Sequence, residues 1–200
     1  MPPGTSTSFL PFSMSGVSVS FQSPDGKQTW PGRLWYVSPT QINLQIPWEL
    51  QGLASAQLFV NVADVSVPYT IPISPYLPAM YGYNNLAIAQ DRNYELVTAS
   101  NPAQRGQYIV IYANGLGAVD NPPPSGEATP AQPLAKTLAT PTVTIGGVVA
   151  PQVLFSGLTP GSIGLYQIDV VVPANAPTGV QPVVITQNGV SSLPANLPIQ

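Results

Sequence analysis

The sequence contains two copies of one short motif, and this repeat constrains the fold more than any other feature. Residues 41–47 read Gln-Ile-Asn-Leu-Gln-Ile-Pro, and residues 167–173 read Gln-Ile-Asp-Val-Val-Val-Pro. Each copy is followed by a turn that carries a glycine, Gly52 or Gly179, and then by a second apolar run. A repeat of this length indicates two copies of one β-rich structural unit.

The second copy has more strand-like sequence before it than the first. Residues 107–112 form a strongly apolar run that ends in Asn-Gly-Leu-Gly at 114–117. Nothing comparable precedes the first copy, in which only residues 1–15 come before the first predicted strand. We therefore expect the amino-terminal unit to be incomplete and to take backbone from elsewhere to close its hydrophobic layers.

The turn-forming residues predict an all-β fold. The 25 prolines and 17 glycines are spread along the whole chain, which is typical of short strands joined by turns. Residues 16–21 alternate apolar and polar side chains, the period of a half-buried strand. Further strands are predicted at 33–37, 42–46, 56–62, 65–73, 107–112, 142–145, 153–155, 165–172 and 182–187, with a small hairpin of 86–90 against 94–97. Asn188-Gly189 is a strong signal for a two-residue hairpin turn.

We predict two immunoglobulin-like β-sandwich domains, residues 1–78 and 79–200, because many short strands at this spacing are typical of that fold. The segment between them, Ser-Pro-Tyr-Leu-Pro at 74–78, is short and stiff. Pro68 and Pro72 predict that strand 65–73 lies at the edge of its sheet, since proline has no N–H to donate. A hairpin turn is expected at 63–64.

Composition excludes several classes of function. The chain has no His and no Cys, which removes Ser-His-Asp and Cys-His catalysis, disulfides and thiolate metal sites. Charged residues make up 6%, and five basic side chains at a net charge of -3 cannot neutralise a row of phosphates, so nucleic acid is not an expected partner. No signal peptide and no membrane-spanning run are visible, and we expect no cofactor and no enzymatic activity.

The carboxylates leave two alternatives open. Asp91 with Glu95, and Asp120 with Glu127, are the pairs nearest in sequence. Either pair could serve as a glycosidase dyad or contribute to a calcium site. We favour turn formation and surface charge, because the spacing of known calcium loops is absent. Lysine isopeptide cross-links, as in some adhesins, are disfavoured because no partner motif accompanies the two lysines.

Three groups of residues together resemble one protein family. They are residues 33–43 with 47–49, residues 101–103 with 112–117, and residues 155–158 with 164–167. This combination is similar to the uncharacterised carboxy-terminal domain family of exported acidobacterial (Solibacter-type) proteins. The resemblance covers roughly residues 16–192.

The resemblance implies a tandem of immunoglobulin-like units, similar to the transcription-factor-type domains of cell-surface receptors. It also implies an extracellular or cell-surface location, commonly after propeller or repeat regions, and carries no catalytic residues. Family members usually have a strand ending in a Gly-Leu turn before the equivalent of Gly16, and this chain departs from that pattern.

We therefore predict a structural or interaction module, such as a subunit of a surface fibre assembled by β-strand addition. Its partner would be another copy of the chain or another surface protein. The predicted donor segments are the low-charge extension of residues 1–14, which contains Phe9, Leu10 and Phe12, or the tail at 193–200.

The alternative is a carbohydrate-binding or adhesion module. Trp30, Trp35 and Trp48 enrich the first domain in aromatic rings, and a planar row of such rings stacks on sugars. Core and corner packing is the explanation we favour for these tryptophans.

Overall fold

The computed structural model describes residues 9–63 and 65–200, and these residues are all-β, as predicted. Their only helix is a single 3-10 turn, η1 (Trp48–Leu50). Within the described part of the chain, no helix is long and apolar enough to cross a membrane.

The chain forms two compact units. Unit 1 comprises Met1–Pro75 together with two later segments, Pro122–Pro130 and Pro160–Gly164. Unit 2 comprises Tyr76–Asn121, Ala131–Thr159 and Leu165–Gln200. The chain therefore changes unit first between Pro75 and Tyr76, and the two later segments return to unit 1.

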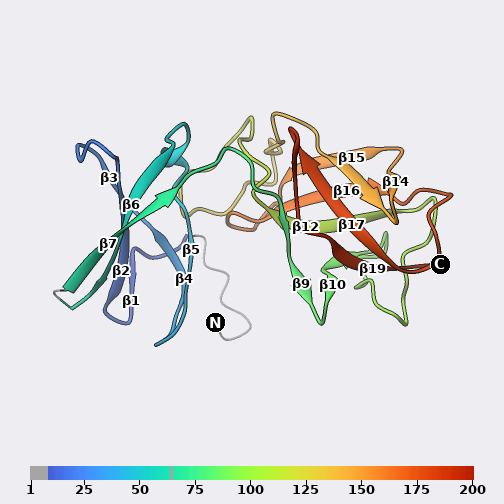
Figure 1. The fold of residues 1–200 in the computed structure, drawn as a ribbon, viewed down its shortest axis with the longest axis horizontal. Coiled ribbons are helices and arrows are strands. Elements are labelled where there is room, and N and C mark those ends of the chain that lie inside the picture. The colour runs from blue at the N-terminus through green and yellow to red at the C-terminus, as the bar shows by residue number, and fades with distance from the viewer. Residues whose placement is uncertain (1–8, 64) are drawn as a thin grey trace. The chain divides into compact units, whose positions relative to one another are not determined.

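Unit 1 has two sheets of very different size (Figure 1). The larger is antiparallel and contains β1 (Ser13–Met14), β2 (Val17–Gln22), β3 (Thr29–Pro31), β6 (Ser55–Val62) and β7 (Val65–Pro72). The smaller has only β4 (Arg33–Val37) and β5 (Ile42–Gln45). Core residues come from both sheets and from η1: Val19, Phe21, Leu34, Leu50 and Ala56.

Strand β7 ends the larger sheet, as its prolines predicted. It pairs with β6, with Pro68 opposite Phe59 and Pro72 opposite Ser55. Two prolines four residues apart face the same side of a strand, and each lacks a donor there. The outer edge of β7 is therefore poor in N–H groups. The turn predicted at 63–64 includes Asp64, which lies outside the described residues.

Unit 2 has two larger sheets. One has the order β14 (Val148–Val149), β13 (Thr142–Ile145), β17 (Gly179–Gln187), β19 (Ala195–Ile199), β10 (Leu86–Ala87), β9 (Gly82–Tyr83), with β18 (Val190–Ser191) also on β17. The other has the order β11 (Ala89–Gln90), β12 (Tyr108–Asn114), β16 (Tyr166–Val171), β15 (Val153–Leu158), with β8 (Ala79–Met80) on β12. The predicted Asn188-Gly189 hairpin joins β17 to β18.

One predicted hairpin of unit 2 forms only in part. Residues 89–91 pair with 95–97, through the antiparallel bridge of Gln90 with Leu96 and the hydrogen bonds from Val97 N–H to Ala89 O and from Asp91 N–H to Glu95 O, both 2.9 Å. Residues 86–90 are not one strand, however, because β10 joins β19 and β11 joins β12 in the other sheet.

The sequence repeat is also a structural repeat. β4 pairs with β5, and β15 pairs with β16, with a register irregularity at the same place, Trp35 in unit 1 and Leu154 in unit 2. After each copy the same turn closes, with Leu50 N–H donating to Pro47 O at 3.2 Å and Ala176 N–H donating to Pro173 O at 3.1 Å. Strand β5 is therefore the counterpart of β16.

Gly115 is a glycine for structural reasons. Its φ is +72°, and a Cβ there would lie 1.9 Å from the Leu77 carbonyl oxygen. The carbonyl of Gly115 also accepts a hydrogen bond from Leu77 N–H at 2.9 Å. Close backbone packing thus explains the glycine at position 115.

We expect Gly115→Ala to destabilise unit 2 far more than the matched change Gly147→Ala. Both glycines have positive φ, at a cost of about 1–2 kcal/mol for alanine. Only Gly115 adds the clash with Leu77, worth about 1–3 kcal/mol more. Scanning calorimetry of the two variants measures the difference, and equal melting temperatures would contradict this packing.

Candidate functional site: the outer edge of strand β5

Strand β16 of unit 2 is covered on both edges. It pairs with β15 on one side and with β12 on the other, where Tyr108–Ala113 run antiparallel to Tyr166–Val171. The ladder continues at Val172, whose N–H donates to Gln107 O at 2.9 Å and whose carbonyl accepts from Gly106 N–H at 2.8 Å. Ile168, Val170 and Val172 therefore direct their backbone groups toward β12, because alternate residues of a strand face the same edge.

The counterparts of these three residues in unit 1 are Ile42, Leu44 and Ile46. By this equivalence their N–H and C=O groups point away from β4. Outside the β4–β5 ladder, none of these groups hydrogen-bonds with a described residue. Within the described part of unit 1, β5 thus has no neighbour on the edge that β12 covers in unit 2.

Burial of the side chains differs in the same way. Ile168, Val170 and Val172 are fully buried, at 0% exposure. Ile42 and Leu44 are only half-buried against the core, and Ile46 is 51% exposed. Fully burying one such side chain contributes about 1.5–3 kcal/mol. Unit 1 therefore forgoes a stabilisation that the same positions supply in unit 2.

Residues 1–8 of the predicted donor segment lie outside the described residues. Its residues 9–12 lie at the other side of the small sheet. Leu34 N–H of β4 donates to Pro11 O at 2.9 Å, and Leu10 is fully buried, with its N–H donating to Gly126 O at 2.7 Å. Phe9 and Phe12 are exposed, and the guanidinium carbon of Arg33 lies 3.7 Å from the Phe12 ring centroid. Residues 9–12 are thus docked within unit 1, beside β4.

The proline-rich segment Pro122–Pro130 binds the end of β5 through side chains. Gln45 Oε1 accepts from Gly126 N–H at 2.7 Å. Ser125 Oγ accepts from Trp48 N–H at 2.9 Å and donates to Glu49 Oε2 at 2.6 Å. These contacts close the carboxyl end of β5 but form no ladder along it.

The same end of β5 has buried donors that lack partners. Gln45 Nε2 and Trp48 Nε1, which flank Ile46, and Arg33 Nε are buried without a hydrogen bond to any described residue. Most buried polar groups in folded proteins are satisfied by protein or by ordered water, so these donors are candidates for hydrogen bonds to water or to a partner.

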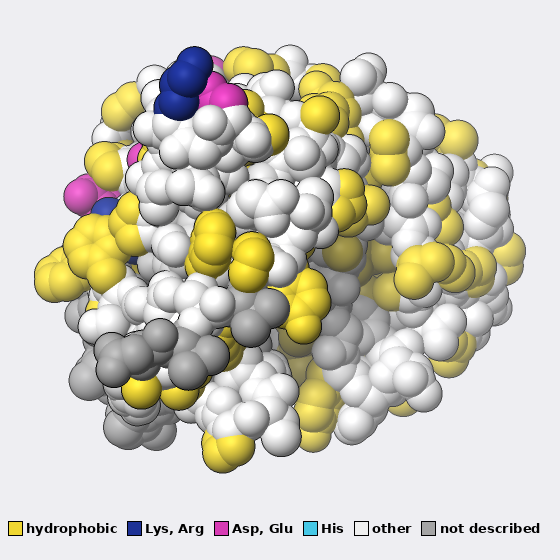
Figure 2. Space-filling model, turned by 60° about the vertical axis from the view of Figure 1, so that its left-hand side comes forward, with side chains coloured by type: hydrophobic (Ala, Val, Ile, Leu, Met, Phe, Trp, Pro, Cys, Tyr) yellow, Lys and Arg dark blue, Asp and Glu magenta, His cyan; other side chains and the backbone are white. Residues whose placement is uncertain are grey.

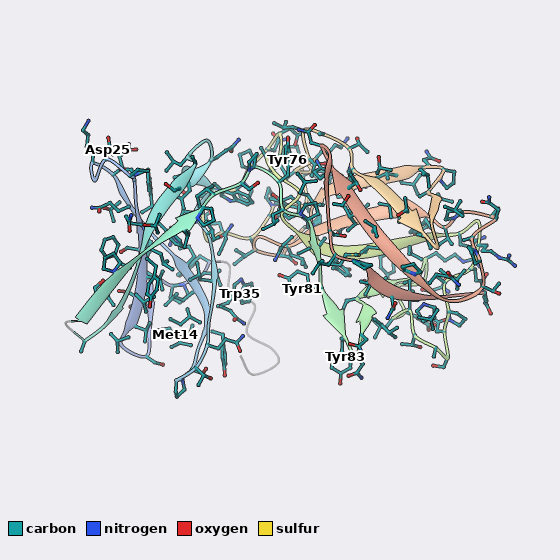
Figure 3. All side chains as sticks on the ribbon, in the orientation of Figure 1. Met14, Asp25, Trp35, Tyr76, Tyr81 and Tyr83 are labelled. Carbon is teal, nitrogen blue, oxygen red and sulfur yellow. The ribbon has the colours of Figure 1, made fainter. Side chains whose placement is uncertain are left out.

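The three tryptophans predicted as glycan contacts belong to different elements. Trp30 lies on β3 and packs against the core of unit 1. Trp48 is half-buried in η1, while Trp35, at the β4 irregularity, is 39% exposed next to the exposed Tyr36. In Figure 3, Met14 lies between the sheets of unit 1 and Trp35 lies on the other side of the small sheet. Only Trp35 presents much of its ring to solvent.

The predicted carboxylate pairs act in turns. Asp91 Oδ1 accepts from the N–H groups of Asn93 and Glu95 at 2.8 and 3.0 Å. Partial desolvation opposes the effect, but these hydrogen bonds and one from Asn101 hold the pKa of Asp91 below its usual value. Asp120 Oδ1 accepts from Lys136 N–H at 2.7 Å. No cluster of three acidic side chains suited to a metal ion occurs in the part of the chain that the structure describes.

Burial raises the pKa of Asp169, and the hydrogen bond from Gln167 Nε2 partly opposes this rise. Asp169 is the counterpart of Asn43, which is exposed on β5. Charged residues make up 6% of the chain, and on the face that Figure 2 shows a few basic and acidic groups, some of them adjacent, lie among hydrophobic and uncharged polar side chains.

Comparison of the chain with protein-family models and with curated proteins finds no match to either.

Sequence reasoning missed the contribution of Pro122–Pro130 to unit 1. The segment has no strand periodicity, and its prolines indicate a loop without indicating what the loop contacts. The buried Gln45 was the one available signal, since a glutamine at a core-adjacent position needs a hydrogen-bond partner.

We expect Gln45→Ala to lower the free energy of unfolding of unit 1 by about 1–3 kcal/mol, because it leaves the buried Gly126 N–H unpaired. Gln57→Ala, which removes an exposed hydrogen bond to Thr70 in the same unit, should cost about 0.5 kcal/mol or less. All three tryptophans lie in unit 1, so their fluorescence in urea follows this unit alone. Equal costs for the two variants would rule out this role of Gln45.

Proposed function

We propose that this protein is a non-catalytic extracellular interaction module whose unit 1 receives a β-strand from a neighbouring polypeptide. Each unit would be an immunoglobulin-like sandwich, with unit 1 completed in this way. The observation that carries the proposal is the contrast between Ile46 and Val172, equivalent residues of which one is 51% exposed and the other fully buried. An added strand would bury Ile46 and pair the free backbone edge of β5.

The energetics support strand addition. Each new main-chain hydrogen bond contributes about 0.5–1.5 kcal/mol, and burial of three apolar side chains adds several kcal/mol. Ordering the incoming strand costs about 1–2 kcal/mol per residue. These contributions are similar in size, so the balance favours a strand that brings its own apolar side chains to the core.

The location and the assembly rest on the resemblance to exported proteins. A low-charge surface, with 6% charged residues, also suits close contact between subunits. Residues 9–12 are docked within unit 1, and β19 takes up much of the tail of unit 2. A fibre of identical subunits would therefore require one of these segments to leave its own unit.

Carbohydrate binding is the second candidate, supported by the exposed Trp35 and Tyr36. A row of all three tryptophans is less favoured, because Trp30 packs inward.

A labelled peptide with the sequence of residues 104–117, which contains β12, tests strand addition. We expect fluorescence anisotropy to show micromolar binding to the intact chain. Ile46→Lys should weaken binding about tenfold or more, because it places a charge where the added strand must bury an apolar side chain. Val62→Lys is the matched control, since Val62 is 54% exposed on the larger sheet of the same unit.

Absence of binding at several hundred micromolar peptide, or equal weakening by both lysine variants, would contradict the proposal. Light scattering of the same proteins then identifies the donor. Growth of mass with concentration, lost in Ile46→Lys, indicates donation between copies. A constant monomer mass together with peptide binding indicates a different polypeptide.

A further inference from the structure

We infer that the strand added to unit 1 is antiparallel to β5 and has the side-chain pattern of β12, in the register that β12 has on β16. This inference rests on the proposed function and specifies its partner: an uncharged, extended segment with apolar residues at alternate positions, supplied by a neighbouring polypeptide. The internal repeat provides the template, because β5 and β16 share sequence, pairing and the turn that follows.

The template fixes the direction of the added strand. In unit 2, Ile111 lies opposite Ile168 and Ile109 lies opposite Val170, on antiparallel strands. All four side chains are fully buried. The partner of unit 1 should therefore place apolar side chains opposite Ile42 and Leu44.

The template also fixes what the partner carries on its other face. Val110 lies opposite Asp169, whose counterpart on β5 is the exposed Asn43. The backbone of Asp169 faces β15, so Val110 and Asp169 form a non-hydrogen-bonded pair, the type in which side chains approach most closely. We therefore expect the added strand to place an uncharged residue opposite Asn43.

Of the two edges formed by β5 and β7, the edge of β5 is better suited to an added strand. The outer edge of β7 carries Pro68 and Pro72, which remove donors from an incoming ladder. Strand β5 contains no proline, and the first one after it is Pro47. An incoming strand therefore finds an unbroken row of donors along β5 and not along β7.

Cysteine cross-linking tests the register, because the chain has no cysteine of its own. Asn43→Cys introduces one thiol on the exposed face of β5. It is mixed, in a glutathione redox buffer, with peptides of residues 104–117 that carry Val110→Cys, Tyr108→Cys or Tyr112→Cys. Cross-strand non-hydrogen-bonded pairs match the separation that a disulfide requires.

We expect the Val110→Cys peptide to cross-link at least about tenfold faster than the other two, which correspond to registers shifted by two residues. Thr70→Cys on β7 is the control edge and should give no register-selective cross-link. Urea unfolding followed by tryptophan fluorescence verifies that both protein variants are folded.

Equal cross-linking of the three peptides to Asn43→Cys, preference for another position, or faster reaction at Thr70→Cys would overturn the inference while leaving strand addition itself standing, provided that the unmodified peptide binds. If no peptide binds in the anisotropy titration, the proposed function fails and the inference with it.

Discussion

An apolar strand in a two-sheet protein needs a neighbour on each side, and among the described residues of unit 1 (9–63 and 65–75, with 122–130 and 160–164) β5 has one on only one side. Backbone donors and acceptors on an unpaired edge remain available to any extended chain. The side chains of such a strand also stay partly in water, as those of Ile42 and Leu44 do. In unit 1 a larger sheet of five strands faces a sheet of only two, β4 and β5.

Two segments of unit 1 contact the small sheet and cover parts of it other than the outer edge of β5. Residues 9–12 cover the β4 side of the small sheet, and Pro122–Pro130 fastens the end of β5 through Gln45 and Ser125. Neither segment provides a ladder along β5 between Ile42 and Ile46. Within the part of unit 1 that the structure describes, the outer edge of β5 therefore has no neighbouring strand, and this is the basis of the proposed strand addition.

Much of the fold was predictable from sequence, because local patterns determine it. Alternation of apolar and polar residues located β2, the motif located β5 and β16, and the prolines placed β7 at an edge. That unit 1 is incomplete was inferred from comparing the two copies and stays a prediction.

Long-range contacts were not predictable in the same way. The sequence of residues 86–90 predicts one short strand. In the structure these residues are divided between two sheets at Ile88, because tertiary packing determines which strands pair. Residues 122–130 contact the rest of unit 1 through individual side-chain hydrogen bonds. The spacing of apolar residues in the sequence does not reveal such contacts. The tryptophans were visible in sequence, but which of them packs inward depends on the strand that carries each one.

Amide hydrogen exchange, measured residue by residue by NMR, reports whether the outer edge of β5 is unpaired. In the chain without any added strand, we expect the outward-facing amides of Leu44 and Ile46 to exchange about a hundredfold or more faster than those of Val170 and Val172. The amide of Asn43, which faces β4, should be protected and serves as the internal control. Protection of the Leu44 and Ile46 amides equal to that of Val170 and Val172 would mean that the outer edge of β5 is already occupied, and would rule out the proposed strand addition.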